Sequence, residues 1–287
     1  MKKLLILSGK GGTGKTTVAS AFIKLSSAKA FADCDVDAPN LHLIMQQKLE
    51  PKKIDYLGMG KAKIDSEKCV NCGLCQIKCS FDAIKKYKEC YNVDAYSCEG
   101  CGVCEAICYA RAIKVYPDIA GELMLYKNDF TFSTAQLKMG SGTSGKLVTE
   151  VKKQLDLAEI NTKIAIIDGS PGIGCPVIAS LSGVDMVLIV SEPSLSGISD
   201  MKRIISTAQK FAVKTVVCVN KYDTNLENTI KIEKLCEEFE LDFVGRIPFD
   251  SNVVKAVNKG KSIVEFDCLA TDAIKSVFDK TINILNT

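Results

Sequence analysis

The sequence predicts an α/β fold in which a doubly wound, mostly parallel sheet is interrupted by a smaller inserted module. Short runs of Ile, Val and Leu alternate with amphipathic helical patterns along most of the 287 residues. This alternation is typical of buried parallel strands joined by crossover helices. In the middle of the chain the apolar periodicity gives way to closely spaced cysteines, and the alternation resumes afterwards. The cysteine-rich part is therefore an insertion and not an appended tail.

Five apolar runs are the predicted strands: Leu4–Leu7, Ala30–Asp33, Ile164–Ile167, Met186–Val190 and Thr215–Val219. Helical spacing of apolar residues predicts the helices Thr16–Ser27, Leu147–Leu157, Ile198–Phe211 and Leu226–Phe239. A last helix, Ala270–Leu285, is expected to close the main core. The main domain is thus assigned to residues 1–56 and 117–287, and the inserted α+β module to residues 57–116.

Composition argues against several classes of protein. The 37 Lys and Arg nearly balance the 34 Asp and Glu and form no long basic run, so we expect no nucleic-acid partner. No segment reaches the roughly 18 uninterrupted apolar residues of a spanning helix, so we expect no stable membrane insertion. The run Leu4–Leu7 is too short for a signal peptide and leads into a glycine loop. We therefore expect a cytoplasmic location.

Eight of the fourteen cysteines form a repeated pattern. The strings CVNCGLCQIKC and CEGCGVCEAIC share one spacing, and an Ala-Ile pair follows each at a similar offset, which indicates an internal duplication. In a reducing compartment such cysteines point to metal ligation. In each string, two residues separate the first three cysteines from one another, and three residues separate the third from the fourth. This is the pattern of bacterial ferredoxins with two iron–sulfur clusters, in which the fourth cysteine of one string ligates the cluster of the other string.

The predicted ligands of one [4Fe-4S] cluster are Cys69, Cys72, Cys75 and Cys108, and those of the other are Cys79, Cys98, Cys101 and Cys104. Zinc is the alternative, but a structural zinc needs two Cys-x-x-Cys pairs and not two sets of this form. Cys90 has no counterpart in the repeat and is expected to be a bystander. Cys34, Cys218, Cys236 and Cys268 are expected to be small buried residues.

The string GKGGTGKT, Gly9–Thr16, lies between an apolar strand and a helix, which is the context of a Walker A loop. Its backbone N–H groups and the start of the next helix would point at phosphates. Lys15 would bridge the β- and γ-phosphates, and the Thr16 hydroxyl would bind Mg²⁺. The predicted phosphate and Mg²⁺ residues are Gly11, Gly12, Thr13, Gly14, Lys15, Thr16 and Thr17.

With its early lysine, Lys10, this loop resembles the deviant Walker A loop of the MinD, ParA, Mrp and nitrogenase-iron-protein family. The whole chain is similar to MinD-superfamily P-loop ATPases that contain an inserted ferredoxin domain. The resemblance implies Mg²⁺-dependent hydrolysis of ATP to ADP and a homodimer that forms when ATP binds. In such a dimer Lys10 would reach the phosphates bound by the partner chain, so Lys10, Lys15 and Asp35 are the predicted catalytic residues.

The resemblance also assigns roles to the loops after later strands. In the segment that resembles switch I, Asp33 would belong to the metal shell and Asp35 would orient the attacking water. After the predicted strand Ile164–Ile167, Asp168 would hold Mg²⁺ through water, and the Gly172 amide would sense the γ-phosphate. Asn220, Asp223 and Pro248 would lie at the adenine, although a plain turn is the alternative for the segment around Asn220.

Two features depart from the related patterns. Ser80 and Tyr109 stand where ferredoxins usually place proline after the fourth cysteine. Cys175 lies seven residues after Asp168, an offset at which the nitrogenase iron protein has a cysteine that holds a cluster between two subunits. Its companion would fall near Thr143, so that pair is incomplete, and a packed or partner-facing thiol is the alternative for Cys175.

Together these patterns predict an ATPase in which nucleotide-driven dimerisation gates electron transfer or metallocluster assembly through two [4Fe-4S] clusters. The expected partner is a redox or cluster-accepting protein that the sequence does not identify. One alternative is an iron–sulfur cluster carrier or assembly factor whose clusters are cargo. Another is a positioning ATPase that uses the inserted module for docking.

Overall fold

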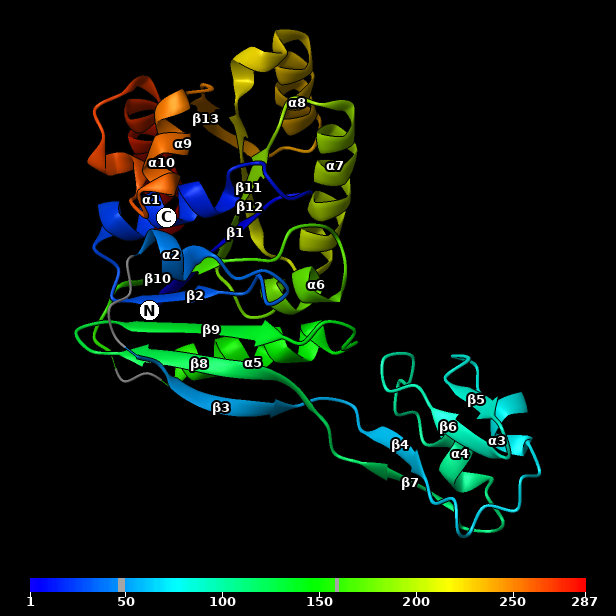
Figure 1. Cartoon of the computed structure of the whole chain (residues 1–287). Helices are drawn as coiled ribbons and strands as arrows, with labels where there is room; N and C mark the ends of the chain where they lie inside the picture. Colours follow the sequence, from blue (N-terminus) through cyan, green and yellow to red (C-terminus); the bar gives the residue numbers. More distant parts are fainter. Residues whose placement is uncertain (46–49, 158–159) are drawn as a thin grey trace. The chain divides into compact units, whose positions relative to one another are not determined.

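The computed structural model describes residues 1–45, 50–157 and 160–287 and divides into two compact units (Figure 1). Unit 1 comprises Met1–Lys53, Met124–Ala135 and Gly145–Thr287. Unit 2 comprises Ile54–Leu123 and Gln136–Ser144. The chain therefore leaves unit 1, forms most of unit 2, and then returns.

The largest sheet in the described residues has nine strands in the order β13-β12-β11-β1-β10-β2-β9-β8-β3. Every neighbouring pair from β13 to β9 is parallel. The five predicted strands are the consecutive group from β12 to β2, so the predicted α/β class and mostly parallel sheet are confirmed. The strands are β1 (Lys2–Leu7), β2 (Ala30–Asp33), β3 (Lys52–Leu57), β8 (Ile119–Lys127), β9 (Thr131–Leu137), β10 (Ile164–Asp168), β11 (Met186–Ser191), β12 (Lys214–Asn220) and β13 (Asp242–Ile247).

Helices cover both faces of this sheet in unit 1, which makes it doubly wound (Figure 1). On one face α1, α9 and α10 pack over Leu4 and Ile6 of β1, and on the other α7 packs on β11 and β12. Phe22 of α1 meets Phe278 of α10 edge to face at 5.1 Å, so the last helix closes the core as predicted. The helices are α1 (Lys15–Ser26), α2 (Leu41–Ile44), α5 (Ser144–Asp156), α6 (Cys175–Leu181), α7 (Leu195–Lys210), α8 (Leu226–Glu238), α9 (Ser251–Asn258) and α10 (Leu269–Asn286), with 3-10 turns η1 (Tyr222–Thr224) and η2 (Ile263–Glu265).

Burial on both faces explains the composition of the central strands. Leu4, Leu5, Ile6 and Leu7 of β1 are all fully buried, because successive side chains point to opposite faces and both faces carry helices. Each such side chain contributes roughly 1.5–3 kcal/mol through burial. The parallel arrangement brings the carboxyl ends of β1, β2 and β10 to one edge of the sheet, where ligands of doubly wound folds bind.

The cysteine-rich part of unit 2 is built from two small antiparallel sheets and two short helices. The sheets are β4 (Lys61–Ile64) with β7 (Ile113–Tyr116), and β5 (Ile84–Tyr87) with β6 (Cys90–Val93). The helices are α3 (Leu74–Ile77) and α4 (Val103–Ala106). The core of this unit contains Ala62, Ile84, Tyr91 and Ile113 together with six of the eight cysteines of the repeat.

Unit 2 is larger than the predicted module, residues 57–116. Residues on both sides of that interval pack with the returning segment 136–144. The Lys138 N–H donates to the Ala120 carbonyl at 2.7 Å, and the Tyr56 hydroxyl donates to the Thr143 carbonyl at 3.4 Å. The sequence boundary followed the cysteine-rich composition, whereas these flanking residues belong to the unit through backbone contacts.

The backbone of unit 2 repeats as the sequence does. Residues with left-handed φ angles recur 29 positions apart, at 71 and 100, at 73 and 102, and at 82 and 111. Hydrogen bonds recur at the same interval: Asp65 N–H donates to Ala112 O, and Asp94 N–H donates to Ala83 O. The duplication is thus present in the structure as well as in the cysteine spacing.

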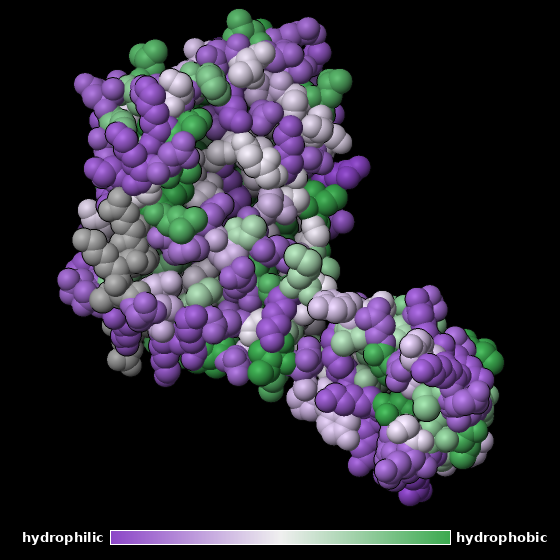
Figure 2. Space-filling model, in the orientation of Figure 1, coloured by the Kyte–Doolittle hydropathy of each residue, from purple (hydrophilic) through white to green (hydrophobic). Residues whose placement is uncertain are grey.

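On the visible faces, hydrophobic residues occur as scattered groups among hydrophilic ones (Figure 2). In the part of the chain that the structure describes, none of the helices combines the length and apolar character needed to cross a membrane.

Candidate functional site

The glycine loop after β1 leaves open backbone at the start of α1. Gly12 and Gly14 have φ angles of 79° and 93°, which glycine adopts without strain. At Gly11 and Gly12 no atom lies within 4 Å of the position that a Cβ would take. Gly14 precedes α1 and no side chain caps the helix, so the first N–H groups of α1 remain available to an anion.

Lys15 and Asp168 form a buried ion pair beneath this loop. The Lys15 Nζ lies 2.5 Å from Asp168 Oδ1, and the two side chains are 6% and 0% exposed. Burial lowers the pKa of Lys15, but the carboxylates of Asp168 and Asp33 outweigh it and hold that pKa above its ordinary value. Within the described residues, Asp168 Oδ2 and Thr13 Oγ1 are buried without a hydrogen-bond partner. These orphaned oxygens are unsatisfied in the protein alone.

Asp33 orders the segment that follows β2. Its carboxylate accepts hydrogen bonds from the backbone N–H groups of Asp35, Asn40 and Leu41 at 2.9–3.0 Å. Burial and the nearby charge of Asp168 raise the pKa of Asp33 to about 7. Burial also raises the pKa of Asp35, which is only partly buried. Asp33 is thus held in the fold, and Asp35 is the more accessible of the two carboxylates.

The segment after β10 is tied to its neighbours by two hydrogen bonds. The Gly172 N–H donates to the Ser8 carbonyl at 3.0 Å, with a left-handed φ of 94° at Gly172. The Ser170 hydroxyl donates to the Cys34 carbonyl at 2.5 Å. The Gly172 amide, which we predicted to sense the γ-phosphate, therefore donates its hydrogen bond to the residue that follows β1.

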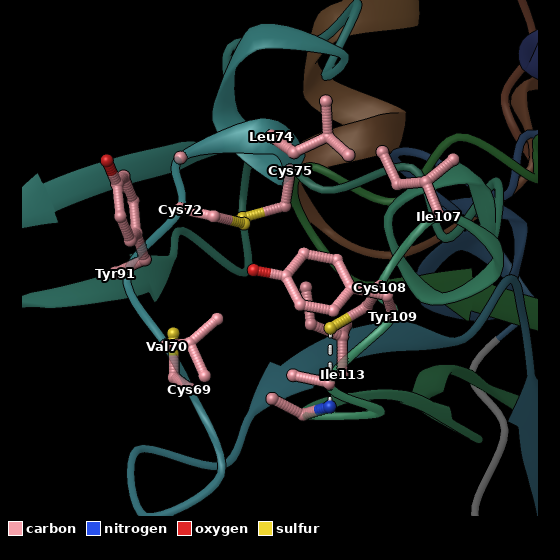
Figure 3. A pocket seen from close by; sticks show the side chains of 13 residues that line it. Cys69, Val70, Cys72, Leu74, Cys75, Tyr91, Ile107, Cys108, Tyr109 and Ile113 are labelled. Carbon is pink, nitrogen blue, oxygen red and sulfur yellow. Dashed lines mark hydrogen bonds between the residues drawn. The ribbon is translucent and has the colours of Figure 1, made fainter.

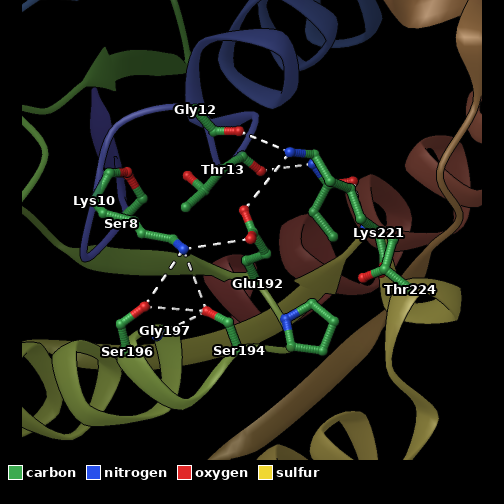
Figure 4. Close-up of polar contacts among 12 residues, drawn as sticks. Ser8, Lys10, Gly12, Thr13, Glu192, Ser194, Ser196, Gly197, Lys221 and Thr224 are labelled. Carbon is green, nitrogen blue, oxygen red and sulfur yellow. Dashed lines mark hydrogen bonds and ion pairs between the residues drawn. The ribbon is translucent and has the colours of Figure 1, made fainter.

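Lys10 lies in a polar network that the sequence did not predict (Figure 4). Its Nζ lies 3.3 Å from Glu192 Oε1 and donates to the hydroxyls of Ser194 and Ser196 at 3.3 and 3.4 Å. Glu192 also faces Lys221, whose Nζ donates to the Gly12 carbonyl at 2.9 Å. The one available signal for Glu192 was its place two residues after the end of a predicted strand, Met186–Val190, at the same edge of the sheet as the motif loops.

The residues predicted to contact adenine are held by the protein itself. The Asn220 amide nitrogen donates to the Thr13 carbonyl at 2.6 Å, and its oxygen accepts from the Lys221 N–H. Asp223 accepts from the Phe249 N–H at 2.8 Å, which brings it next to the loop of Pro248. Asn220 thus supports the phosphate loop, and the adenine contacts of all three residues stay predictions.

The phosphate site fits a nucleotide with Mg²⁺. Its open glycine backbone suits phosphate oxygens, and the orphaned Asp168 Oδ2 and Thr13 Oγ1 are oxygen groups of the kind that Mg²⁺ and its bound water engage. Thr16 and Thr17 follow in the first turn of α1 and are both partly exposed. Lys15 already carries the positive charge that phosphates require.

In unit 2 the predicted cysteine sets lie around two cavities. The first is lined by Cys69, Cys72, Cys75 and Cys108 (Figure 3). The second is lined by Cys79, Cys98, Cys101 and Cys104. Each cavity has about 370 Å³ of space, part of it open to solvent. Three cysteines of each set come from one half of the repeat and the fourth from the other half.

The remaining surroundings of the first cavity are mostly apolar, with Val70, Leu74 and Ile113 among its walls. Tyr109, at the position where ferredoxins usually have proline, also lines this cavity. The Ala112 N–H lies 3.3 Å from Cys108 Sγ and donates to it, as backbone amides do to cluster ligands. The residues present therefore fit a group bound by four thiolates.

No group of three or more His, Cys, Asp or Glu in the described ranges is arranged to hold a single metal ion. That arrangement needs donor atoms packed around one centre, with Zn–S distances of about 2.3 Å. A [4Fe-4S] cluster would place its own iron and sulfide atoms between the cysteine sulfurs, so it requires a wider separation of the sulfurs than a single ion does.

The other cysteines divide by burial. Cys34, Cys218 and Cys236 are buried, as predicted, and burial raises the pKa of each thiol to about 12. Cys268 is partly buried, and Cys90 is exposed. Cys175 is also exposed and begins α6, where its Cβ and backbone lie against Gly145.

Fold and site together define a nucleotide-binding protein of the doubly wound α/β class, with a phosphate loop at the carboxyl edge of a parallel sheet. Residues 4–263 match the family described as the CobQ/CobB/MinD/ParA nucleotide binding domain. The chain belongs to this family of MinD/ParA-type P-loop ATPases.

Known relatives are similar over nearly the whole chain. An uncharacterized protein of Methanocaldococcus jannaschii is 32% identical over 97% of this chain and 95% of its own length. An iron–sulfur cluster carrier protein of Pyrococcus abyssi is 25% identical over 99% of this chain and 86% of its own. The septum site-determining protein MinD of Pyrococcus horikoshii, solved with Mg-ADP, shares the fold with a TM-score of 0.61 at 16% identity, covering 99% of this chain and 96% of that one.

Proposed function

We propose that the chain hydrolyses ATP and carries two [4Fe-4S] clusters, and that nucleotide-dependent dimerisation gates electron transfer or metallocluster assembly through them. The observation that carries this proposal is the grouping of the eight repeat cysteines. Each of two cavities in unit 2 is lined by one complete set of four, in the same chain as the phosphate loop.

The nucleotide part of the proposal rests on charge and backbone geometry. The loop amides and the start of α1 would bind the phosphates of ATP. Lys15 would exchange part of its contact with Asp168 for phosphate oxygens, which frees the Asp168 carboxylate to hold Mg²⁺ through water. Asp35, the more accessible carboxylate after β2, would orient the attacking water.

The dimer part rests on Lys10. Its side chain is partly exposed and is held by Glu192 and two serine hydroxyls, not by the phosphate loop of its own chain. That arrangement supports a role for Lys10 toward the phosphates of a second copy. In that position its charge would stabilise the transition state as an arginine finger does.

The cluster part rests on the composition of unit 2. Its core is small and includes six of the proposed ligands, so iron–sulfur ligation would supply cohesion that apolar side chains alone do not. When bound, each cluster supplies one-electron redox chemistry at a potential set by its surroundings. The chain's own residues hold the thiolates, donate an amide hydrogen bond to Cys108 and shield the site with apolar walls.

A second candidate is a cluster carrier, in which the clusters are cargo. It is favoured by the similarity over 99% of the chain to proteins named iron–sulfur cluster carrier proteins. Transfer of intact clusters to an apo-ferredoxin would favour the carrier function, whereas stable clusters that cycle between oxidation states would favour electron delivery.

The test of the proposal is the iron and acid-labile sulfide content of the anaerobically purified chain. We expect about eight of each per chain, as two [4Fe-4S] clusters require. Cys108→Ser should lose about half of both, because only the first set uses Cys108. Cys90→Ser is the matched control, since Cys90 is exposed and outside both cavities, and should lose none. Stoichiometric zinc without sulfide would refute the proposal.

A further inference from the structure

The outer face of the β4–β7 sheet in unit 2 carries a cluster of positive charge. Lys63, Lys68, Arg111 and Lys114 line a hollow of about 760 Å³ that is open to solvent, and Asp65 and Tyr116 line it with them. We call these four basic residues the cationic hollow. Asp65 forms an ion pair with Lys68 at 2.6 Å. Among the described residues, no ion pair neutralises Lys63, Arg111 or Lys114.

Two of the basic residues lie in positions that are unfavourable for the fold. Lys63 and Lys114 are direct partners across the antiparallel ladder, and like charges in that position are destabilising. Arg111 has a left-handed φ of 51°, a conformation that favours Gly, Asn and Asp over Arg. Among residues 1–45, 50–157 and 160–287, the contact given for the Lys63 ammonium is with a ring, its Nζ lying 5.6 Å from the centre of Tyr116.

The internal duplication provides a comparison within the same chain. Positions 29 residues away form the equivalent face of the β5–β6 sheet, where Lys85 pairs with Asn92. Asp82 occupies the place of Arg111 and lies 3.6 Å from Lys85. Ser97 occupies the place of Lys68 and bonds to Asp94. One cation and two carboxylates thus stand where the cationic hollow has four cations and one carboxylate, so the basic charge is not a property of the repeat.

The hollow adjoins one cysteine set. Lys68 immediately precedes Cys69, the Arg111 N–H donates to the Cys108 carbonyl, and Ala112 lines both the hollow and the first cysteine cavity. A protein bound on the hollow would therefore lie next to the first cluster site. Concentrated charge of one sign also accelerates encounter with an oppositely charged surface.

We propose that the cationic hollow is the docking surface for the acidic face of a partner redox protein, which it places beside the cluster bound by Cys69, Cys72, Cys75 and Cys108. The redox nature of the partner rests on the proposed function. The acidic nature of its surface rests on the charges of the hollow alone.

The experiment measures the affinity of the full chain for a small ferredoxin rich in Asp and Glu. The test variant is Lys63→Asn, Lys68→Ser and Arg111→Asp, which gives each position the residue of its equivalent in the other repeat and so preserves the fold. The control variant, Lys85→Glu with Lys86→Glu, changes the net charge by the same amount on the other sheet. We expect the test variant to bind at least about tenfold more weakly at low salt and to lose most of its salt dependence, and the control to change about twofold or less.

Equal weakening by the two variants would overturn the proposal, because diffuse charge would then explain the binding. Undiminished affinity for the same ferredoxin with amidated carboxylates would also overturn it. Iron and sulfide are measured on each preparation. An iron-replete chain that does not bind the ferredoxin refutes docking alone, whereas lysine-dependent binding by a chain without clusters supports docking and refutes the proposed function.

Discussion

Lys10 and Glu192 show how single side chains set the state of the phosphate site. In this state Glu192 contacts both Lys10 and Lys221, and Lys221 in turn holds the Gly12 carbonyl. Glu192 thus lies between two lysines and holds both near the loop. The nucleotide phosphates would compete with Glu192 for these cations, so we expect Glu192 to restrain Lys10 from reaching the phosphates of a second copy.

The first prediction concerns Glu192→Gln. Removal of the negative charge weakens the hold on Lys10, so ATP-dependent dimerisation should become several-fold tighter, while ATP binding to the monomer changes little. Sedimentation at several protein concentrations with ATP measures the dimer constant. Lys10→Ala is the counterpart and should abolish the ATP-dependent dimer. Weaker dimerisation of Glu192→Gln would contradict this role.

The second prediction concerns pH. The pKa of Asp33 rises from 3.8 to about 7 on folding, so between these values the folded chain retains a proton that the unfolded chain has lost. The contribution of Asp33 to the free energy of unfolding, measured without nucleotide, therefore falls as pH rises from about 4 to about 7. The slope is up to roughly 1.4 kcal/mol per pH unit. Urea unfolding of wild type and Asp33→Asn across this range measures it. The difference between their stabilities should slope with pH, and a constant difference would contradict the assignment.

At the scale of elements, the fold was predictable where a strand is buried on both faces. The strands β1, β2, β10, β11 and β12 are continuous apolar runs, and their sequences indicate them directly. β9 reads TFSTAQL and β13 contains Gly245, so neither stands out by hydrophobicity. The strands β4, β5, β6 and β7 of unit 2 are four residues long, which is too short for a periodic pattern.

The residues of the candidate site were predictable where they belong to a sequence motif, but not where their role depends on a contact between loops. Motif residues follow predicted strands, so their common edge could be inferred from the parallel topology. Glu192 and Lys221 could not, because their roles depend on contacts between loops far apart in the sequence. The same holds for the hydrogen bond from Asn220 to the Thr13 carbonyl.

The third prediction concerns the turn between β1 and α1. A Cβ at Gly14 would lie 2.2 Å from Asn220 Nδ2, at a φ of 93°, so Gly14→Ala displaces Asn220 as well as straining the backbone. We expect ATP affinity to fall by at least about tenfold. Gly183→Ala is the control, because Gly183 has a φ of 68° with open space around it. It should lose roughly 1 kcal/mol of stability and keep its ATP affinity, as titration calorimetry would show.

At the scale of the whole molecule, the order of segments along the chain links the two units. Most of unit 2 lies between Asp35, after β2, and Asp168, at the end of β10. We expect the loops at or directly after both residues to respond to the γ-phosphate. The chain crosses between the two units after Lys53, Leu123, Ala135 and Ser144. We therefore expect the segments that join Asp35 and Asp168 to unit 2 to carry the effect of nucleotide binding to the cysteine cavities.

The fourth prediction concerns removal of iron. Six proposed ligands belong to the core of unit 2, whereas the core of unit 1 is made of apolar side chains. Chelation should therefore unfold unit 2 and leave unit 1 folded. Hydrogen exchange measured by mass spectrometry should show loss of protection in the strands β4, β5, β6 and β7, and unchanged protection in β1 and α1. Unchanged protection in both units after complete iron removal would contradict this view.

The most direct test of the central claim is electron paramagnetic resonance of the anaerobically purified, reduced chain with and without MgATP. The account predicts signals from two reduced [4Fe-4S] clusters whose shape or midpoint potential changes with MgATP. Lys15→Ala, which lacks the lysine predicted to bind phosphate, should show the clusters without that change. Absence of cluster signals, or identical spectra when ATP is bound and when it is absent, would contradict the claim.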